Sequence, residues 1–98
     1  MNAIISHRVG LAVLNDDESA DVINLYSAKF HCVIQSVNDR IVGLEIARRS
    51  RPIVVLVDGD LLEEYLQDFV ARLQARWPRL DIIVIRDGVP EPCCVGIA

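Results

Sequence analysis

The sequence predicts an α/β fold in which helices cover both faces of a parallel sheet. Its 98 residues contain four apolar, strand-like runs that alternate with three amphipathic, helix-like segments. This alternation is typical of parallel sheets joined by right-handed crossovers. Three of the four runs are almost continuously apolar, which indicates strands buried on both faces. With 52% hydrophobic and 24% charged residues, the chain has the composition of one globular domain and not of a disordered segment.

The strands are expected where apolar, mostly β-branched residues cluster, at residues 9–14, 31–37, 53–57 and 80–85. Only the second run alternates polar and apolar residues, which favours the edge of the sheet. Helices are expected where apolar residues recur at helical spacing, at residues 19–30, 38–50 and 61–77. Pro52 and Pro78 each follow a helix and precede a strand, as residues that end helices do. Trp77, at the end of the third helix, is expected to pack in the core, with a role as a binding anchor as the alternative.

Acidic residues follow two of the expected strands directly. Asp58 comes at the end of the third run, and the polar stretch Asn-Asp-Asp-Glu at residues 15–18 follows the first. Because ligands of doubly wound sheets bind beyond the carboxyl ends of the strands, these acids are candidates for a functional site. The alternatives are structural. Asp58 is then a strand-end acid bonded to backbone or to Arg86, and Asp16 and Asp17 cap the first helix without a metal.

Charge and cysteine content narrow the function classes. The net charge of −4 and the pI near 5.0 argue against direct contact with nucleic acid. Apolar runs of only about five residues exclude a membrane span, and the first residues show no secretory pattern. The three cysteines, Cys32, Cys93 and Cys94, are an odd number without an export signal, which indicates reduced thiols and a cytoplasmic location.

Three segments of the chain resemble the response-regulator receiver domain, the CheY-like family with a flavodoxin-like fold. They are LAVLNDDESADVINLY, QSVNDRIVGLEIARRSRPIVVLVD and FVARLQARWPRLDIIVIRD. The middle segment is the most specific, because a turn, an amphipathic helix, Arg-Pro, a β-branched run and a terminal Asp match the family in order. The resemblance implies four parallel strands in the order 2-1-3-4, without the last third of a full receiver. We expect a receiver-like domain at residues 1–88 and an apolar tail at 89–98, whose residues 93–98 form an edge strand or exchange with a second copy.

The resemblance also assigns roles to the acids. In that family, the acid that ends the third strand accepts a phosphoryl group, and an acidic pair after the first strand holds a magnesium ion. Asp58 stands at the phosphoacceptor position, and Asp16, Asp17 and Asp58 are the implied Mg²⁺ ligands, with Asn15 in place of one acid of the pair. Such an ion offsets the charge that otherwise keeps a carboxylate from attacking phosphorus. Asp60 is a further candidate beside Asp58.

The sequence departs from the family at the residues that make the phosphorylation switch. Arg86 replaces the hydroxyl residue after the fourth strand, where it is expected to pair with Asp58 and neutralise it. The lysine that follows the fifth strand in the family has no counterpart, since the only lysine, Lys29, lies in the first helix. The third strand also leads straight into a helix. These departures favour a receiver that has lost its chemistry.

The expected function is therefore a receiver-like signalling module of a bacterial, two-component-like regulatory system. We expect it to act by protein–protein contact, to be neither an enzyme nor phosphorylated, and to need no cofactor. A homodimer through the fourth-strand edge and the tail is expected, with a histidine kinase or a regulator protein as a further partner. The first alternative is a functional or fragmentary receiver that is phosphorylated on Asp58 with Mg²⁺. A small α/β ligand-binding domain is the second, but Gly10 and Gly43 are isolated and form no phosphate loop.

Overall fold

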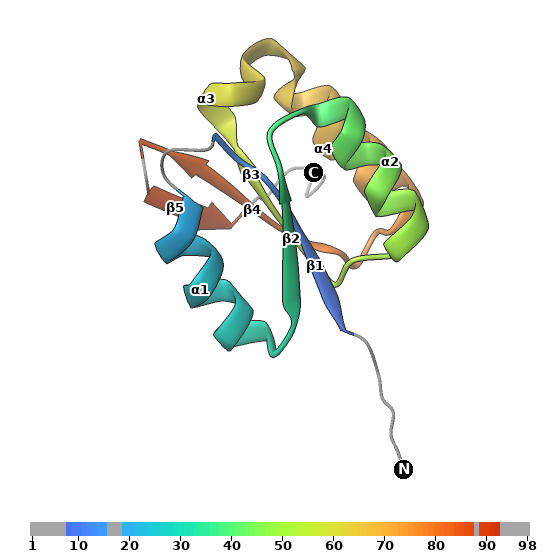
Figure 1. Cartoon of the computed structure of the whole chain (residues 1–98). Helices are drawn as coiled ribbons and strands as arrows, with labels where there is room; N and C mark the ends of the chain where they lie inside the picture. Colours follow the sequence, from blue (N-terminus) through green and yellow to red (C-terminus); the bar gives the residue numbers. More distant parts are fainter. Residues whose placement is uncertain (1–7, 16–18, 88, 93–98) are drawn as a thin grey trace.

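The computed structural model describes residues 8–15, 19–87 and 89–92 of the chain. In these residues five strands form one sheet in the order β2-β1-β3-β4-β5 (Figure 1). The strands are β1 (Val9–Val13), β2 (Val33–Val37), β3 (Val54–Asp58), β4 (Asp81–Arg86) and β5 (Val89–Pro92). The helices are α1 (Ser19–Phe30), α2 (Arg40–Ser50), α3 (Gly59–Leu62) and α4 (Leu66–Arg76), and the 3-10 turn η1 (Glu63–Tyr65) joins the last two. None of the helices described is long and apolar enough to cross a membrane.

Helices cover both faces of the sheet, as the sequence predicts. Figure 1 shows α1 on one side, and α2 and α4 on the other. Alternate residues of β1 and β3 point to opposite sides, so that each face has its own apolar cluster. On the α2 and α4 side the cluster includes Leu11, Val13, Val55, Val57, Phe69 and Leu73. On the α1 side it includes Ala12, Leu14, Tyr26, Leu56 and Ile85.

The four parallel strands stand in the predicted order, but the count of four is incomplete, because a fifth strand, β5, is added antiparallel to β4. Arg86 pairs with Val89, so that two residues link the strands. The first of them, Asp87, has φ 51°, the positive angle that an Asp-Gly hairpin turn requires. The strand thus lies at Val89–Pro92, ahead of the expected position at 93–98, and those last residues lie outside the described part of the chain. The fourth strand is therefore not the bare edge that the sequence suggested.

The predicted third helix, residues 61–77, is also wrong as one continuous element. A short helix begins two residues earlier, at Gly59, and the chain breaks at Glu63, which has φ 50° and ψ −118°. Because α3 follows β3 without a loop, the chain reverses its direction within the helical segment, between β3 and α4. Leu62 and Leu66 both stay buried on either side of the break.

A glycine allows α2 to lie close to the sheet. A Cβ at Gly43 would come within 2.6 Å of Val13 Cγ2, a distance that side chains do not tolerate without rearrangement. Gly43 weakens the helix by about 1 kcal/mol relative to alanine, and the close packing of α2 on β1 explains why a glycine stands there. Asp39 caps this helix by accepting a 2.9 Å hydrogen bond from the Ile41 backbone N–H.

Candidate functional site at the carboxyl ends of the strands

Asp58 is a buried helix cap. Its side chain is only 6% exposed, and its Oδ1 accepts hydrogen bonds from the backbone N–H groups of Asp60, at 2.8 Å, and Leu61, at 3.2 Å. These are donors that the first turn of α3 would otherwise leave unpaired, and such a cap contributes about 1 kcal/mol. The structural alternative for Asp58, a strand-end acid bonded to backbone, is what the geometry shows.

Asp60 ties the start of α3 to the β4–β5 turn. Its Oδ2 accepts a hydrogen bond of 3.2 Å from the backbone N–H of Asp87, a residue 27 positions away in the chain. Asp58 and Asp60 thus use their carboxylates to fix backbone on two neighbouring segments. At the carboxyl ends of the strands, two acids thus hold the segments together by accepting hydrogen bonds from main-chain N–H groups.

Arg86 lies against the β3–α3 junction and does not pair with Asp58. A Cβ at Gly59 would stand 3.2 Å from Arg86 Cγ and 3.4 Å from its Cζ, so the arginine packs over the glycine beside Asp58. Ion pairs within the described residues join Glu45 to two arginines of α2 and Asp68 to Arg72. An ion pair between Arg86 and Asp58 is not among them. The expected contact, in which Arg86 neutralises the charge of Asp58, is therefore not formed.

The predicted magnesium site is only partly described. Asn15 is exposed two residues beyond the end of β1. Asp16 and Asp17 lie outside the described residues, and their convergence on Asp58 remains a prediction. Within the described residues, no three His, Cys, Asp or Glu side chains are placed to hold a metal ion.

A hollow near the carboxyl ends of the strands was not predicted from the sequence. It has a volume of about 360 Å³ and is lined by Asn38, Asp39, Arg40, Ile41, Leu61, Leu62 and Tyr65. The Arg40 guanidinium lies 3.8 Å from the centre of the Tyr65 ring, a cation–π contact that joins the start of α2 to η1. Because the two residues are far apart in the chain, no local spacing in the sequence indicates this contact.

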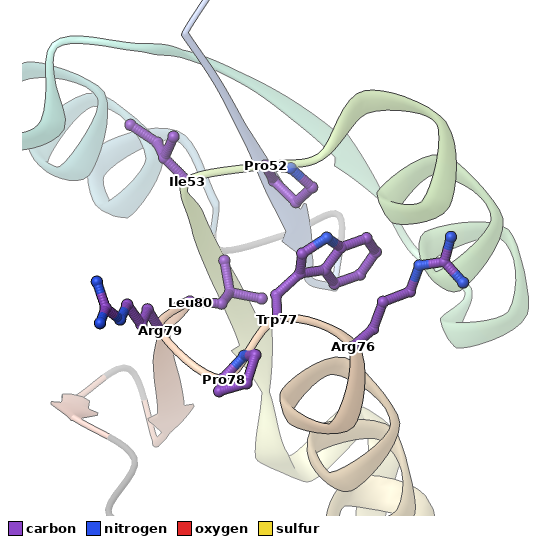
Figure 2. Close-up of a pocket in the computed structure, with 7 residues that line it drawn as sticks. All are labelled: Pro52, Ile53, Arg76, Trp77, Pro78, Arg79 and Leu80. Carbon is purple, nitrogen blue, oxygen red and sulfur yellow. The ribbon is translucent and has the colours of Figure 1, made fainter.

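A second hollow lies at the opposite end of the strands, where β3 and β4 begin (Figure 2). Its volume is about 490 Å³, and it is lined by Pro52, Ile53, Arg76, Trp77, Pro78, Arg79 and Leu80. Figure 2 shows the Trp77 ring below Pro52 and beside Leu80, with Arg76 and Arg79 extending to either side. Trp77 is half-buried and packs against the core cluster of α4, as expected, and the Arg76 guanidinium lies 5.5 Å from its ring.

Cys32 is a buried free thiol just before β2. Burial raises its pKa, and the nearby Arg8 guanidinium opposes this only in part. A thiol that stays protonated is a weak nucleophile, so Cys32 is not a candidate catalytic residue. The other two cysteines, Cys93 and Cys94, lie outside the described residues.

Neither a protein-family model nor a curated protein matches this chain. The resemblance to receiver domains therefore rests on the quoted segments and on the order of the strands.

Proposed function

We propose that this chain is a receiver-like signalling module of a bacterial regulatory system that acts by protein contact without phosphorylation. The observation that carries the proposal is the state of Asp58. It occupies the end of β3, which is the phosphoacceptor position of receivers, but its carboxylate is buried and caps α3. The parallel strands in the order 2-1-3-4, with helices on both faces, support the receiver-like, flavodoxin-like fold.

The surroundings of Asp58 do not favour phosphoryl transfer. The reaction needs an exposed carboxylate oxygen and cations that offset the developing charge. Oδ1 of Asp58 already accepts two hydrogen bonds. The only lysine, Lys29, lies in the last turn of α1, and since α1 runs back to the start of β2, Lys29 stands near the amino ends of the strands, at the other end from Asp58. Arg86 reaches the junction but packs over Gly59.

The alternative is a working receiver that is phosphorylated on Asp58 with Mg²⁺. The position of Asp58 at the carboxyl end of a central parallel strand favours it, because this is where doubly wound folds bind ligands. In this alternative, Asp16 and Asp17 supply the remaining magnesium ligands, and Asp58 gives up its hydrogen bonds to α3 when it is modified.

The test is the intact mass of the protein after incubation with acetyl phosphate and Mg²⁺. The wild type is measured beside Asp58→Asn, and a competent receiver domain treated in parallel shows that the reagent is active. We expect no added phosphoryl group on the wild type. One added group that is absent from Asp58→Asn would overturn the proposal and establish the phosphorylated alternative.

A further inference from the structure

Among the described residues, the outer edge of β2 presents backbone groups that pair with no other strand. Within the described residues β2 pairs only with β1. The Val33 N–H donates to the Arg8 carbonyl, and the Val37 carbonyl accepts from the Leu14 N–H. Backbone groups of a strand alternate in direction, so alternate residues from Val33 to Val37 face β1. Ile34 and Ser36 therefore direct their N–H and C=O groups away from the sheet.

A contact with α1 ends this open edge at Cys32. The Cys32 N–H donates to the Ser27 carbonyl at 3.1 Å, and the Ser27 hydroxyl donates to the Cys32 carbonyl at 2.6 Å. The backbone groups of Cys32 are thus already bonded, although they would otherwise continue the edge. Two donors and two acceptors, on Ile34 and Ser36, remain to bind another strand.

The opposite edge of the sheet is closed to such pairing. Arg86 and Val89 close the two-residue turn, so Val89 and Glu91 direct their backbone groups to β4, while the backbone positions of Pro90 and Pro92 face away from β4. Proline has no N–H, and it is typical of edges that do not bind a further strand. In contrast, the β2 sequence, VIQSV, contains neither proline nor charge.

We propose that a second copy of this chain pairs antiparallel with β2 about a two-fold axis at Gln35, joining the two sheets into one. In this register Ile34 lies opposite the partner subunit's Ser36, and each such pair exchanges two backbone hydrogen bonds. All the open groups are then used. A shift of the axis to Ile34 would place Ser36 opposite the partner's Cys32, whose backbone is bonded to α1.

Side chains along the edge favour the same arrangement. Val33 is 74% exposed and lies opposite the partner's Val37 in this register, and cross-strand pairs of β-branched residues stabilise sheets. The basic residues Arg8, Lys29 and His31 stand around the start of β2, and Asp39 stands just beyond its end, followed by Arg40, whose guanidinium lies 3.8 Å from the centre of the Tyr65 ring. Antiparallel pairing brings the basic start of one strand toward Asp39 of the other, whereas parallel pairing would bring the two basic starts together.

Disulfide trapping tests the register. In a Cys93→Ser, Cys94→Ser background, Gln35→Cys places two thiols across the axis at a non-hydrogen-bonded pair, where Cα atoms stand about 4.5 Å apart, close enough to be bridged. The matched control is Ser36→Cys, whose two copies lie beyond bridging distance in this register. We expect a covalent dimer on mild oxidation from Gln35→Cys alone. Cross-linking of Ser36→Cys to the same extent, or of neither variant, would overturn the proposal.

Sedimentation of unmodified and Ser36→Pro protein tests the pairing itself. The proline removes an N–H that faces away from the monomer, so the fold tolerates it, while one hydrogen bond at each end of the interface is lost. We expect the wild type to dimerise with rising concentration and Ser36→Pro to remain monomeric with unchanged circular dichroism. If the wild type is still monomeric at about 1 mM, its Kd for dimerisation is too weak for a stable dimer. This result would overturn the proposal and would mean that any strand that binds to β2 comes from another protein. A dimer that survives Ser36→Pro also overturns it.

This pairing uses no residue near Asp58. The outcome with acetyl phosphate and the outcome at β2 can therefore be interpreted separately.

Discussion

At the scale of single residues, Asp58 shows how a buried carboxylate at the carboxyl end of a central strand serves the fold. It ends a fully buried strand and accepts two backbone hydrogen bonds at the start of α3. The sequence places an acid there but does not say what the acid contacts. A helix cap needs only an oxygen that accepts hydrogen bonds, whereas a catalytic carboxylate needs its negative charge.

Substitutions of Asp58 separate these two roles. Asparagine caps helices about as well as aspartate, whereas alanine provides no acceptor. We expect Asp58→Ala to lower the free energy of unfolding by about 1–2 kcal/mol, and Asp58→Asn to change it by only a few tenths of a kcal/mol. Urea denaturation measures both. A loss from Asp58→Asn as large as that from Asp58→Ala would show that the negative charge itself stabilises the site.

At the scale of elements, the sequence predicted α1 with its observed bounds, and the four parallel strands to within two residues at each end, because these segments carry clear apolar periods. The sequence also contains a signal for β5, because Asp87-Gly88 between two short runs is a common hairpin sequence. The break at Glu63 has no such signal. Glutamate rarely adopts a positive φ, so the residue type at position 63 does not indicate a break.

For the candidate site, the sequence predicted that Asp58, Asp60 and Arg86 lie together at the carboxyl ends of the strands. It did not predict their contacts, because Asp60 bonds to Asp87 and Arg86 packs on Gly59 across elements. Such contacts depend on side-chain directions at the strand ends, which no local pattern specifies.

Glycine substitutions in η1 test the strain at the break. Glu63 has φ 50°, a conformation that costs a residue with a side chain about 1–3 kcal/mol and that glycine adopts freely. We expect Glu63→Gly to raise the free energy of unfolding by about 1 kcal/mol. The matched control is Glu64→Gly, an exposed neighbour without a positive φ, which is expected to lower it by about 0.5–1 kcal/mol. Equal losses from both variants would show that the break at Glu63 carries no strain.

At the scale of the whole molecule, the two edges of the sheet differ in their capacity to pair. In the part of the chain that the structure describes, the β2 edge has open backbone groups, while the prolines of β5 remove donors from the other edge. A protein with one self-complementary edge forms a closed two-fold dimer, whereas a protein with two such edges adds copies without limit. In the proposed dimer, Pro90 and Pro92 therefore decide whether assembly stops at two chains.

Replacement of these prolines tests that role. Pro90→Thr together with Pro92→Thr restores two outward N–H groups to β5, and threonine suits strands, so the variant has two edges that can pair. We expect light scattering to detect species larger than a dimer that grow with concentration, while the wild type stops at the dimer. Pro78→Thr, in the loop before β4, is the control and should behave as the wild type.

Adding Ser36→Pro to the double threonine variant closes the β2 edge again and should limit assembly to a dimer through β5. Large species that persist in this triple variant would mean that growth uses a surface other than the two sheet edges. If the double variant itself stops at a dimer, some feature of β5 other than its prolines closes that edge, and the asymmetry between the edges has another cause.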